Sequence, residues 1–299
     1  MSWGESQGAT PSETTRRRAR VIAVVNQKGG VGKTTTAVNL AASVAASEHA
    51  TLLVDLDPQG NASSAFSVDA PERQVYDALV GEMPLLQTAH PTELSHLHLV
   101  PAGVDLAGAE IELVSMERRD QRLCDALDPV APEYDFIFID CPPSLGLLTL
   151  NALVAAESVV IPLQCEYYAL EGLARLLATL ERVKESLNPT LAVEGVVLTM
   201  VDRRANLTRQ VEAEVRGHFG EAGAQERGGV FRTSIPRNIR LSEAPSHGKP
   251  ILLYDIQSKG AVSYLALAEE LLQRHTAPAR KPPLLPIRSP DSEGQEGMG

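Results

Sequence analysis

One short loop constrains the fold of this chain more than any other feature. Residues 27–35 read QKGGVGKTT, between an apolar run at residues 21–25 and a helix-forming stretch that we expect to end near Ser47. A glycine-rich loop between a strand and a helix, closed by Lys-Thr, is the context that a phosphate-binding loop requires. Glycines let consecutive N–H groups point inward, and the following helix adds a partial positive charge at its N-terminus. The sequence therefore predicts a nucleotide-binding α/β fold.

The loop assigns roles to individual residues. Lys33 would bring a positive charge to the β- and γ-phosphates of a nucleotide, and the Thr34 hydroxyl is placed to bind Mg²⁺. The expected nucleotide-binding residues of the loop are Lys28, Gly29, Gly30, Val31, Gly32, Lys33, Thr34 and Thr35.

The loop departs from the common pattern G-x-x-x-x-G-K-[ST] at its first position. Gln27 stands where the pattern has glycine, and a second lysine, Lys28, follows it. A single lysine on a loop is usually solvated, but one beside a phosphate-binding loop is placed to contribute its charge to the nucleotide. The second lysine narrows the prediction to one branch of nucleotide hydrolases.

Acidic residues follow two further apolar runs. Residues 51–54 lead into Asp55-Leu56-Asp57-Pro58, and residues 136–139 lead into Asp140. Ligands of an open α/β sheet bind at the carboxyl ends of its strands, so we expect these acids beside the loop. Phosphoryl transfer needs a group that positions the attacking water and acids that hold magnesium. We assign the water to Asp57, the ion to Asp140, directly or through water, and its outer shell to Asp55.

The order of elements predicts a single α/β domain with a mostly parallel, twisted sheet flanked by helices, because strands alternate with helices along the 299 residues. We expect a disordered basic tail over residues 1–19, the folded domain over residues 20–276 and a disordered proline-rich tail over residues 277–299. A helical pattern is also present over residues 116–127.

Composition limits the partners and the compartment. The net charge of −11 argues against a broad basic surface but leaves room for a local patch. Cys124, Cys141 and Cys165 form no C-x-x-C pair, so we expect buried thiols without a disulfide framework or a metal-ligand set. No secretory signal and no run of about 18 apolar residues is visible, which predicts a cytoplasmic protein without membrane attachment.

The motifs together resemble the ParA/Soj/MinD group of deviant-Walker ATPases. Two later segments sharpen the resemblance to the ParA/Soj chromosome-partitioning ATPases: residues 198–207, LTMVDRRANL, and residues 235–250, IPRNIRLSEAPSHGKP. The resemblance covers about residues 20–275. It implies a P-loop fold of the deviant Walker A type and a Mg²⁺-dependent hydrolysis of ATP.

The resemblance also implies residue roles at the nucleotide. In that family the extra lysine, here Lys28, reaches the partner's phosphates across a nucleotide-sandwich homodimer, and it would be catalytic together with Asp57. Gly29 would lie where the two chains approach, so that a bulky side chain there would block dimerisation. Pro236 and Asn238 would lie near the adenine.

DNA binding is implied by arginines in the matched segments. Any single exposed arginine is usually only solvated, but in Soj-type proteins the arginines that match Arg204 and Arg240 contribute to DNA binding. Arg237 lies in the same segment as Arg240 and is a third candidate. We expect contacts to phosphates without base readout, doubled by a dimer.

The function that the resemblance implies is DNA segregation. ATP would form the dimer on nucleoid DNA, and a ParB-like centromere-binding partner would stimulate hydrolysis and release. Three alternatives remain: a ParA-like ATPase that positions another cellular cargo, a MinD-like membrane switch, and a metabolic relative such as an iron–sulfur carrier or an amide-forming ligase. The membrane switch needs a terminal amphipathic helix, which prolines interrupt over residues 281–288.

Overall fold

The computed structural model describes residues 18–166, 168–202, 204–219, 228–275 and 283. Most of both predicted tails lies outside these residues. Ala19, the last residue of the predicted N-terminal tail, is buried in the core. Its N–H donates a hydrogen bond to the Ala131 carbonyl at 2.8 Å, which fixes the chain ahead of the first strand.

A seven-stranded sheet forms the centre of the molecule, in the order β3-β4-β2-β5-β1-β6-β7. All neighbouring strands are parallel except β3, which pairs antiparallel with β4 at the edge. The predicted mostly parallel sheet is therefore confirmed. The strands are β1 Arg20–Val24, β2 Thr51–Asp55, β3 His90–Pro91, β4 Leu97–Val100, β5 Phe136–Asp140, β6 Ser158–Gln164 and β7 Ala192–Thr199.

Helices connect the strands. They are α1 Lys33–Ala46, α2 Asn61–Ser64, α3 Val75–Val80, α4 Leu85–Thr88, α5 Leu106–Glu112, α6 Arg122–Leu127, α7 Leu147–Ala155, α8 Ala169–Ser186, α9 Asn206–Phe219, α10 Ile239–Glu243, α11 Ile251–Tyr254 and α12 Lys259–Gln273. The helix expected over residues 116–127 forms only in its second half, as α6. Arg118 takes a left-handed backbone conformation, φ 52°, which no α-helix accommodates.

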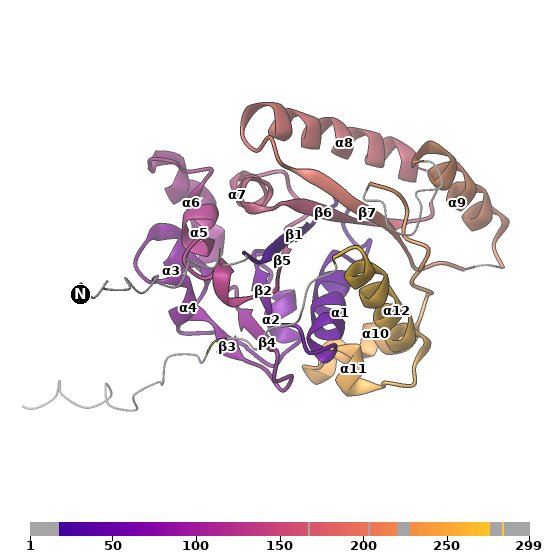
Figure 1. Ribbon diagram of the computed structural model, residues 1–299, viewed down its shortest axis with the longest axis horizontal. Helices are drawn as coiled ribbons and strands as arrows, with labels where there is room; N and C mark the ends of the chain where they lie inside the picture. The colour runs from indigo at the N-terminus through magenta and orange to yellow at the C-terminus, as the bar shows by residue number, and fades with distance from the viewer. Residues whose placement is uncertain (1–17, 167, 203, 220–227, 276–282, 284–299) are drawn as a thin grey trace, which may run out of the picture.

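The central strands are buried on both faces, which explains their continuous apolar runs. Along β1, Val21 and Ala23 pack into one core while Ile22 and Val24 pack into the other. The first core lies under α7 and α8, and the second lies under α1 and α12 (Figure 1). Within the described ranges, no helix is both long and apolar enough to span a membrane.

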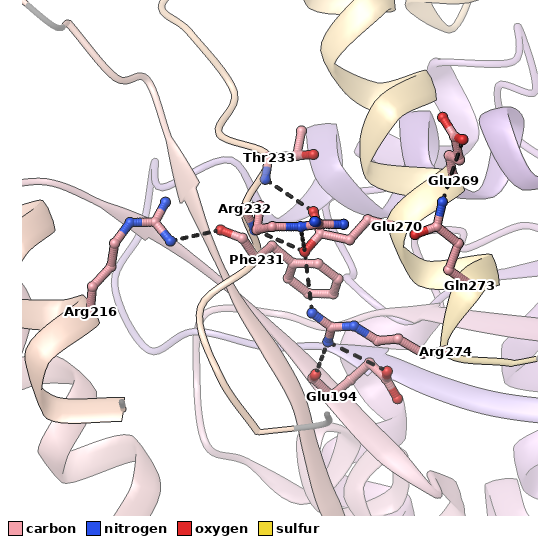
Figure 2. Close-up of polar contacts among 9 residues, drawn as sticks. All are labelled: Glu194, Arg216, Phe231, Arg232, Thr233, Glu269, Glu270, Gln273 and Arg274. Carbon is pink, nitrogen blue, oxygen red and sulfur yellow. Dashed lines mark hydrogen bonds and ion pairs between the residues drawn. The ribbon is translucent and has the colours of Figure 1, made fainter. Parts of the chain in front are cut away.

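A buried ionic network joins the last helix to β7 (Figure 2). The Arg274 guanidinium donates to the Glu194 carbonyl at 2.6 Å and to the Glu270 carboxylate at 3.4 Å, and it lies 4.0 Å from the centre of the Phe231 ring. The Glu270 carboxylate also accepts the backbone N–H groups of Arg232 and Thr233, at 2.8 and 3.0 Å. The network thereby fixes the stretch of chain that leads to Pro236.

Arg274→Ala is expected to lower the free energy of unfolding by about 3–5 kcal/mol, because it leaves buried carboxylates without their cation. Urea denaturation followed by circular dichroism measures the change. Arg175→Ala is the matched control: this arginine pairs with Glu171 but its side chain is 71% exposed, so a loss below about 1 kcal/mol is expected. Equal losses in the two variants would contradict a stabilising role for the buried network.

Candidate functional site: a nucleotide cleft at the carboxyl edge of the sheet

The register of the central strands brings the sequence motifs together. In the parallel ladders, Asp140 of β5 lies opposite Asp55 of β2 on one side and Val24 of β1 on the other. The glycine-rich loop that follows β1 therefore begins beside both acids. Parallel pairing places all three carboxyl ends at one edge, as the sequence predicted.

Two glycines shape the loop itself. Gly30 and Gly32 have φ values of 75° and 87°, a left-handed region that residues with side chains rarely adopt. The Gly32 carbonyl accepts the N–H of Thr36 at 2.9 Å and so opens α1. Val31 is buried, so only its backbone is available to a nucleotide, and its carbonyl accepts the Thr199 hydroxyl at 2.8 Å.

A cleft of about 470 Å³ opens over this loop, and its lining includes Gly30, Lys33, Thr34 and Asp57. A second pocket of about 300 Å³ adjoins it and shares Gly32, Thr35, Met200 and Pro245 with the first. The lining of the second pocket also includes Pro236, Asn238 and Tyr264. Pro236 and Asn238, which were predicted to lie near the adenine, therefore line a pocket beside the nucleotide loop, and their contact with a base stays a prediction.

Lys33 is poised between the loop and the acids. Its side chain is buried, and its Nζ donates to the Lys28 carbonyl at 3.4 Å. Burial lowers the pKa of Lys33, while Asp140 and Asp57 act in the opposite direction. The ammonium group therefore already lies at the base of the cleft, where phosphates would arrive.

Asp140 is the residue best suited to a metal ion. It is fully buried, and burial together with the Asp55 carboxylate raises its pKa well above the usual range. The Thr34 hydroxyl is close enough to lower that pKa, yet neither carboxylate oxygen has a hydrogen bond of normal geometry within the described residues.

A complete metal site is not formed by the protein alone. Among the described residues, no group of three or more His, Cys, Asp or Glu side chains could hold a metal ion. Mg²⁺ commonly binds through one or two carboxylates together with substrate phosphates. Asp140 and Thr34 therefore fit an ion that arrives with a nucleotide.

The two acids of the β2 motif have different surroundings. Asp55 accepts hydrogen bonds from the N–H and hydroxyl of Ser63, at 2.8 and 2.7 Å, and from the N–H of Asp57 at 3.2 Å. Burial nevertheless raises the pKa of Asp55 to about 6. Asp57 lines the cleft and uses one oxygen to accept the N–H of Gln59 at 3.0 Å. Asp55 thus shapes the turn that carries Asp57, and its role in the outer magnesium shell stays a prediction.

Lys28 does not line the cleft of its own chain. Asn26 sets its backbone: the Asn26 amide donates to the Pro162 carbonyl at 2.7 Å and accepts the Lys28 N–H at 2.9 Å. The Lys28 ammonium forms an ion pair with Glu166, and both side chains are about half exposed.

The arginines expected to contact DNA lie on neighbouring segments. Val201 and Pro236 form a parallel bridge, which brings the segment carrying Arg204 alongside the segment carrying Arg237. Arg204, Arg237 and Arg240 are all exposed. Arg240 is not free, however, because it pairs with Glu243 at 3.0 Å and with Asp255 at 3.6 Å.

Sequence reasoning missed several residues around the cleft. Thr199 ends β7 at the same edge, and Met200 follows it. Both lie in the matched segment of residues 198–207, but nothing in that segment indicated a contact with the cleft. Met200 lines both pockets and has a left-handed backbone conformation, φ 52°. Such strain in a non-glycine residue is typical of functional sites. Cys141 and Cys165 are buried as expected, whereas Cys124 is partly exposed.

The loop, the acids at the strand ends and the parallel sheet define a P-loop nucleotide hydrolase with an additional lysine. Residues 19–193 match a family model described as an AAA domain. The chain is 60% identical over 259 residues to the chromosome partitioning protein ParA of Myxococcus xanthus, covering 86% of this chain and 89% of that protein. It is 55% identical over 254 residues to the sporulation initiation inhibitor protein Soj of Bacillus subtilis, covering 84% and 98%. The chain belongs to the ParA/Soj family of chromosome-partitioning ATPases.

Solved structures confirm the fold. One is a Mycobacterium smegmatis protein described as cobyrinic acid a,c-diamide synthase, with bound ADP and magnesium. It is 36% identical to this chain, with a TM-score of 0.73, and the match covers 90% of this chain and 100% of that protein. The cell division ATPase MinD of Pyrococcus furiosus is 25% identical with a TM-score of 0.70, covering 85% and 99%.

Lys33→Ala is expected to abolish detectable Mg-ATP binding, a loss of at least about 100-fold, because charge-assisted hydrogen bonds to phosphates contribute roughly 1.5–3 kcal/mol each. Isothermal titration calorimetry with a non-hydrolysable ATP analogue measures the affinity. Lys259→Ala is the control, since Lys259 is an exposed lysine at the start of α12. Unchanged affinity in Lys33→Ala would show that the nucleotide binds elsewhere.

Proposed function

We propose that this chain is an ATP-dependent, dimerising, DNA-binding ATPase that segregates chromosome or plasmid DNA with a ParB-like partner. The observation that carries the proposal is the position of Lys28. This second lysine is half-exposed beside the nucleotide cleft but does not line it. A cation so placed can serve the phosphates of a second chain better than those of its own.

The loop geometry supports a dimer. A side-chain atom added at Gly29 would meet nothing within 4 Å, and the backbone there needs no positive φ. Glycine at this position is therefore not required by the described chain itself. Close approach of a second copy explains why a side chain is absent where one would fit.

ATP and Mg²⁺ are the cofactors that the site supports. Structures of the Mycobacterium smegmatis relative contain magnesium with ADP or an ATP analogue, and a MinD of Pyrococcus horikoshii contains Mg-ADP. Here Asp140 and Thr34 would hold the ion, which neutralises phosphate charge when bound. Lys33 stabilises the charge that develops on the terminal phosphates, and the N–H groups of the loop orient them. Asp57, which lines the cleft, positions the attacking water.

Asp57→Ala is expected to keep ATP affinity but lower turnover by about 100- to 10,000-fold, the usual contribution of a group that positions or deprotonates a nucleophile. The variant should therefore remain on DNA in the presence of ATP, because hydrolysis no longer releases it. Single-turnover hydrolysis and DNA retention are measured together. Asp69→Ala, which changes an exposed acid outside the cleft, is the control. Turnover at the wild-type rate in Asp57→Ala would contradict this role.

The DNA-binding surface is proposed at Arg204, Arg237 and Arg240. The bridge between Val201 and Pro236 places these segments side by side, and the second pocket connects Arg237 and Asn238 with the nucleotide loop. The overall charge of −11 allows only a local patch, so binding would depend on two copies acting together. DNA phosphates would compete with Glu243 and Asp255 for Arg240.

Arg240→Glu is expected to weaken ATP-dependent DNA retention and to lower the salt dependence of log K by roughly one unit for each lost phosphate contact. Fluorescence anisotropy with mixed-sequence duplexes at several salt concentrations measures both. Arg175→Glu reverses the charge of another exposed, paired arginine, on α8, and should bind as the wild type does. DNA retention unchanged by Arg240→Glu, with ATP affinity intact, would refute the assignment.

The alternative functions, an amide-forming ligase, the positioning of another cargo and a membrane switch, can be distinguished from DNA partitioning. The amide-forming relative is only 36% identical, against 60% for the ParA protein of Myxococcus xanthus, which favours partitioning. A different cargo would leave the nucleotide site unchanged and alter only the partner. An ATPase assay with DNA, with a ParB-like protein and with both tests the proposal directly. Stimulation by DNA and partner together is the expected result, with the protein located on the nucleoid; binding to liposomes instead would favour the membrane switch.

A further inference from the structure

We propose that Glu166 is a positioning residue for the second lysine. Its carboxylate holds the Lys28 ammonium in the nucleotide-free chain, and this contact must break when two chains pair around ATP. The inference rests on the proposed function, because it concerns the dimer that Lys28 would join. It adds a residue outside the nucleotide motifs that sets how readily this dimer forms.

The position of Glu166 follows from the sheet. Strand β6 pairs with β1 in parallel, with Val24 opposite Val160, so the chain leaves both strands at the same edge. The Glu166 N–H donates to the Gln164 carbonyl at 2.8 Å, and its carbonyl accepts the Ala169 N–H at 2.9 Å, ahead of α8. Two backbone hydrogen bonds therefore fix the residue that faces Lys28.

The backbone of Lys28 is fixed from the same strand. Asn26 bonds the Pro162 carbonyl of β6 with its amide nitrogen and the Lys28 N–H with its amide oxygen. The geometry of the lysine and that of its carboxylate partner thus both depend on the β1–β6 pair. Lys28 and Glu166 meet because hydrogen bonds at the ends of these two adjacent strands fix the backbone of both residues.

The role of the contact between Lys28 and Glu166 is not to stabilise the fold. The side chains of Lys28 and Glu166 are 48% and 46% exposed, and ion pairs of this exposure contribute little to folding stability. Its effect lies in where it leaves the ammonium group, which is paired with a carboxylate outside the cleft. A phosphate of a second chain must displace Glu166, whose negative charge would otherwise repel the arriving phosphates.

A symmetric dimer contains two such lysines, so both contacts are lost when it forms. The contact therefore raises the concentration of ATP-bound chain that is needed for pairing. ADP, without the third phosphate, offers less negative charge to replace the Glu166 carboxylate. Glu166 would thus make dimerisation more selective for ATP.

The test is the variant Glu166→Gln, which keeps the size of the side chain and removes its charge. With a non-hydrolysable ATP analogue and Mg²⁺, sedimentation equilibrium should give a dimer dissociation constant about 2- to 30-fold below the wild-type value, the range for two exposed ion pairs. Glu171→Gln is the matched control, since Glu171 forms a similarly exposed pair with Arg175 on α8. The control should dimerise as the wild type does.

A second readout concerns the free chain. Without nucleotide, Glu166→Gln should raise the rate of Lys28 acylation by a water-soluble reagent by about 2- to 5-fold relative to Lys184 in the same molecule, measured by mass spectrometry. A purely structural role would not change this ratio. Glu171→Gln should leave it unaltered.

The outcomes separate the two proposals. A wild-type chain that stays monomeric with Mg²⁺ and the analogue would refute the proposed function, and this inference with it. If the wild type dimerises but Glu166→Gln has an equal or larger dissociation constant, only the inference is wrong. An unchanged acylation ratio would also overturn it, since Glu166 would then not hold the lysine.

Discussion

The in-register pairing of β5 with β2 and β1 is the constraint on which the rest of the site depends. It places the buried Asp140 opposite Asp55 at the edge where the glycine-rich loop begins. Burial raises the pKa of both carboxyl groups, and the charge of Asp55 adds to the rise at Asp140. Lys33 offsets part of this charge, and a magnesium nucleotide would complete the compensation. The fold therefore keeps two buried acids close together at this edge of the sheet.

The nucleotide loop is also joined to the distant arginine segments. The Thr199 hydroxyl bonds the Val31 carbonyl, and two residues later Val201 pairs with Pro236. The network around Glu270 and Arg274 anchors the chain just before Pro236 from the other side. Strain at Met200, between the two pockets, lies on the same route. These contacts connect the nucleotide loop with the segments that carry the proposed DNA-binding arginines.

Much of the architecture was predictable because local and global signals agree. The apolar runs of β1, β2 and β5 are visible in the sequence because these strands are buried on both faces. Prediction failed where the backbone conformation of a single residue decides where a helix forms. The left-handed conformation of Arg118, for example, interrupts a helical pattern. It also failed for contacts between residues far apart in the chain. Glu166 lies outside the matched segments, and the segment that contains Thr199 gave it no role at the loop. Only their place at the sheet edge makes these two residues neighbours of the loop.

The sequence by itself determined the nucleotide chemistry. Binding of phosphates and magnesium requires particular residue types at particular places, and the chain has them: the spaced glycines, Lys33, Thr34 and the acids after the apolar runs. It also determined that a second lysine stands beside the loop. Only the tertiary structure decided what surrounds that lysine. Strand order put β6 next to β1, so Lys28 meets Glu166 and does not line its own cleft. The reason is physical. The sequence gives the type of each side chain, but the partner of an exposed charged side chain depends on which strands lie next to each other in the sheet.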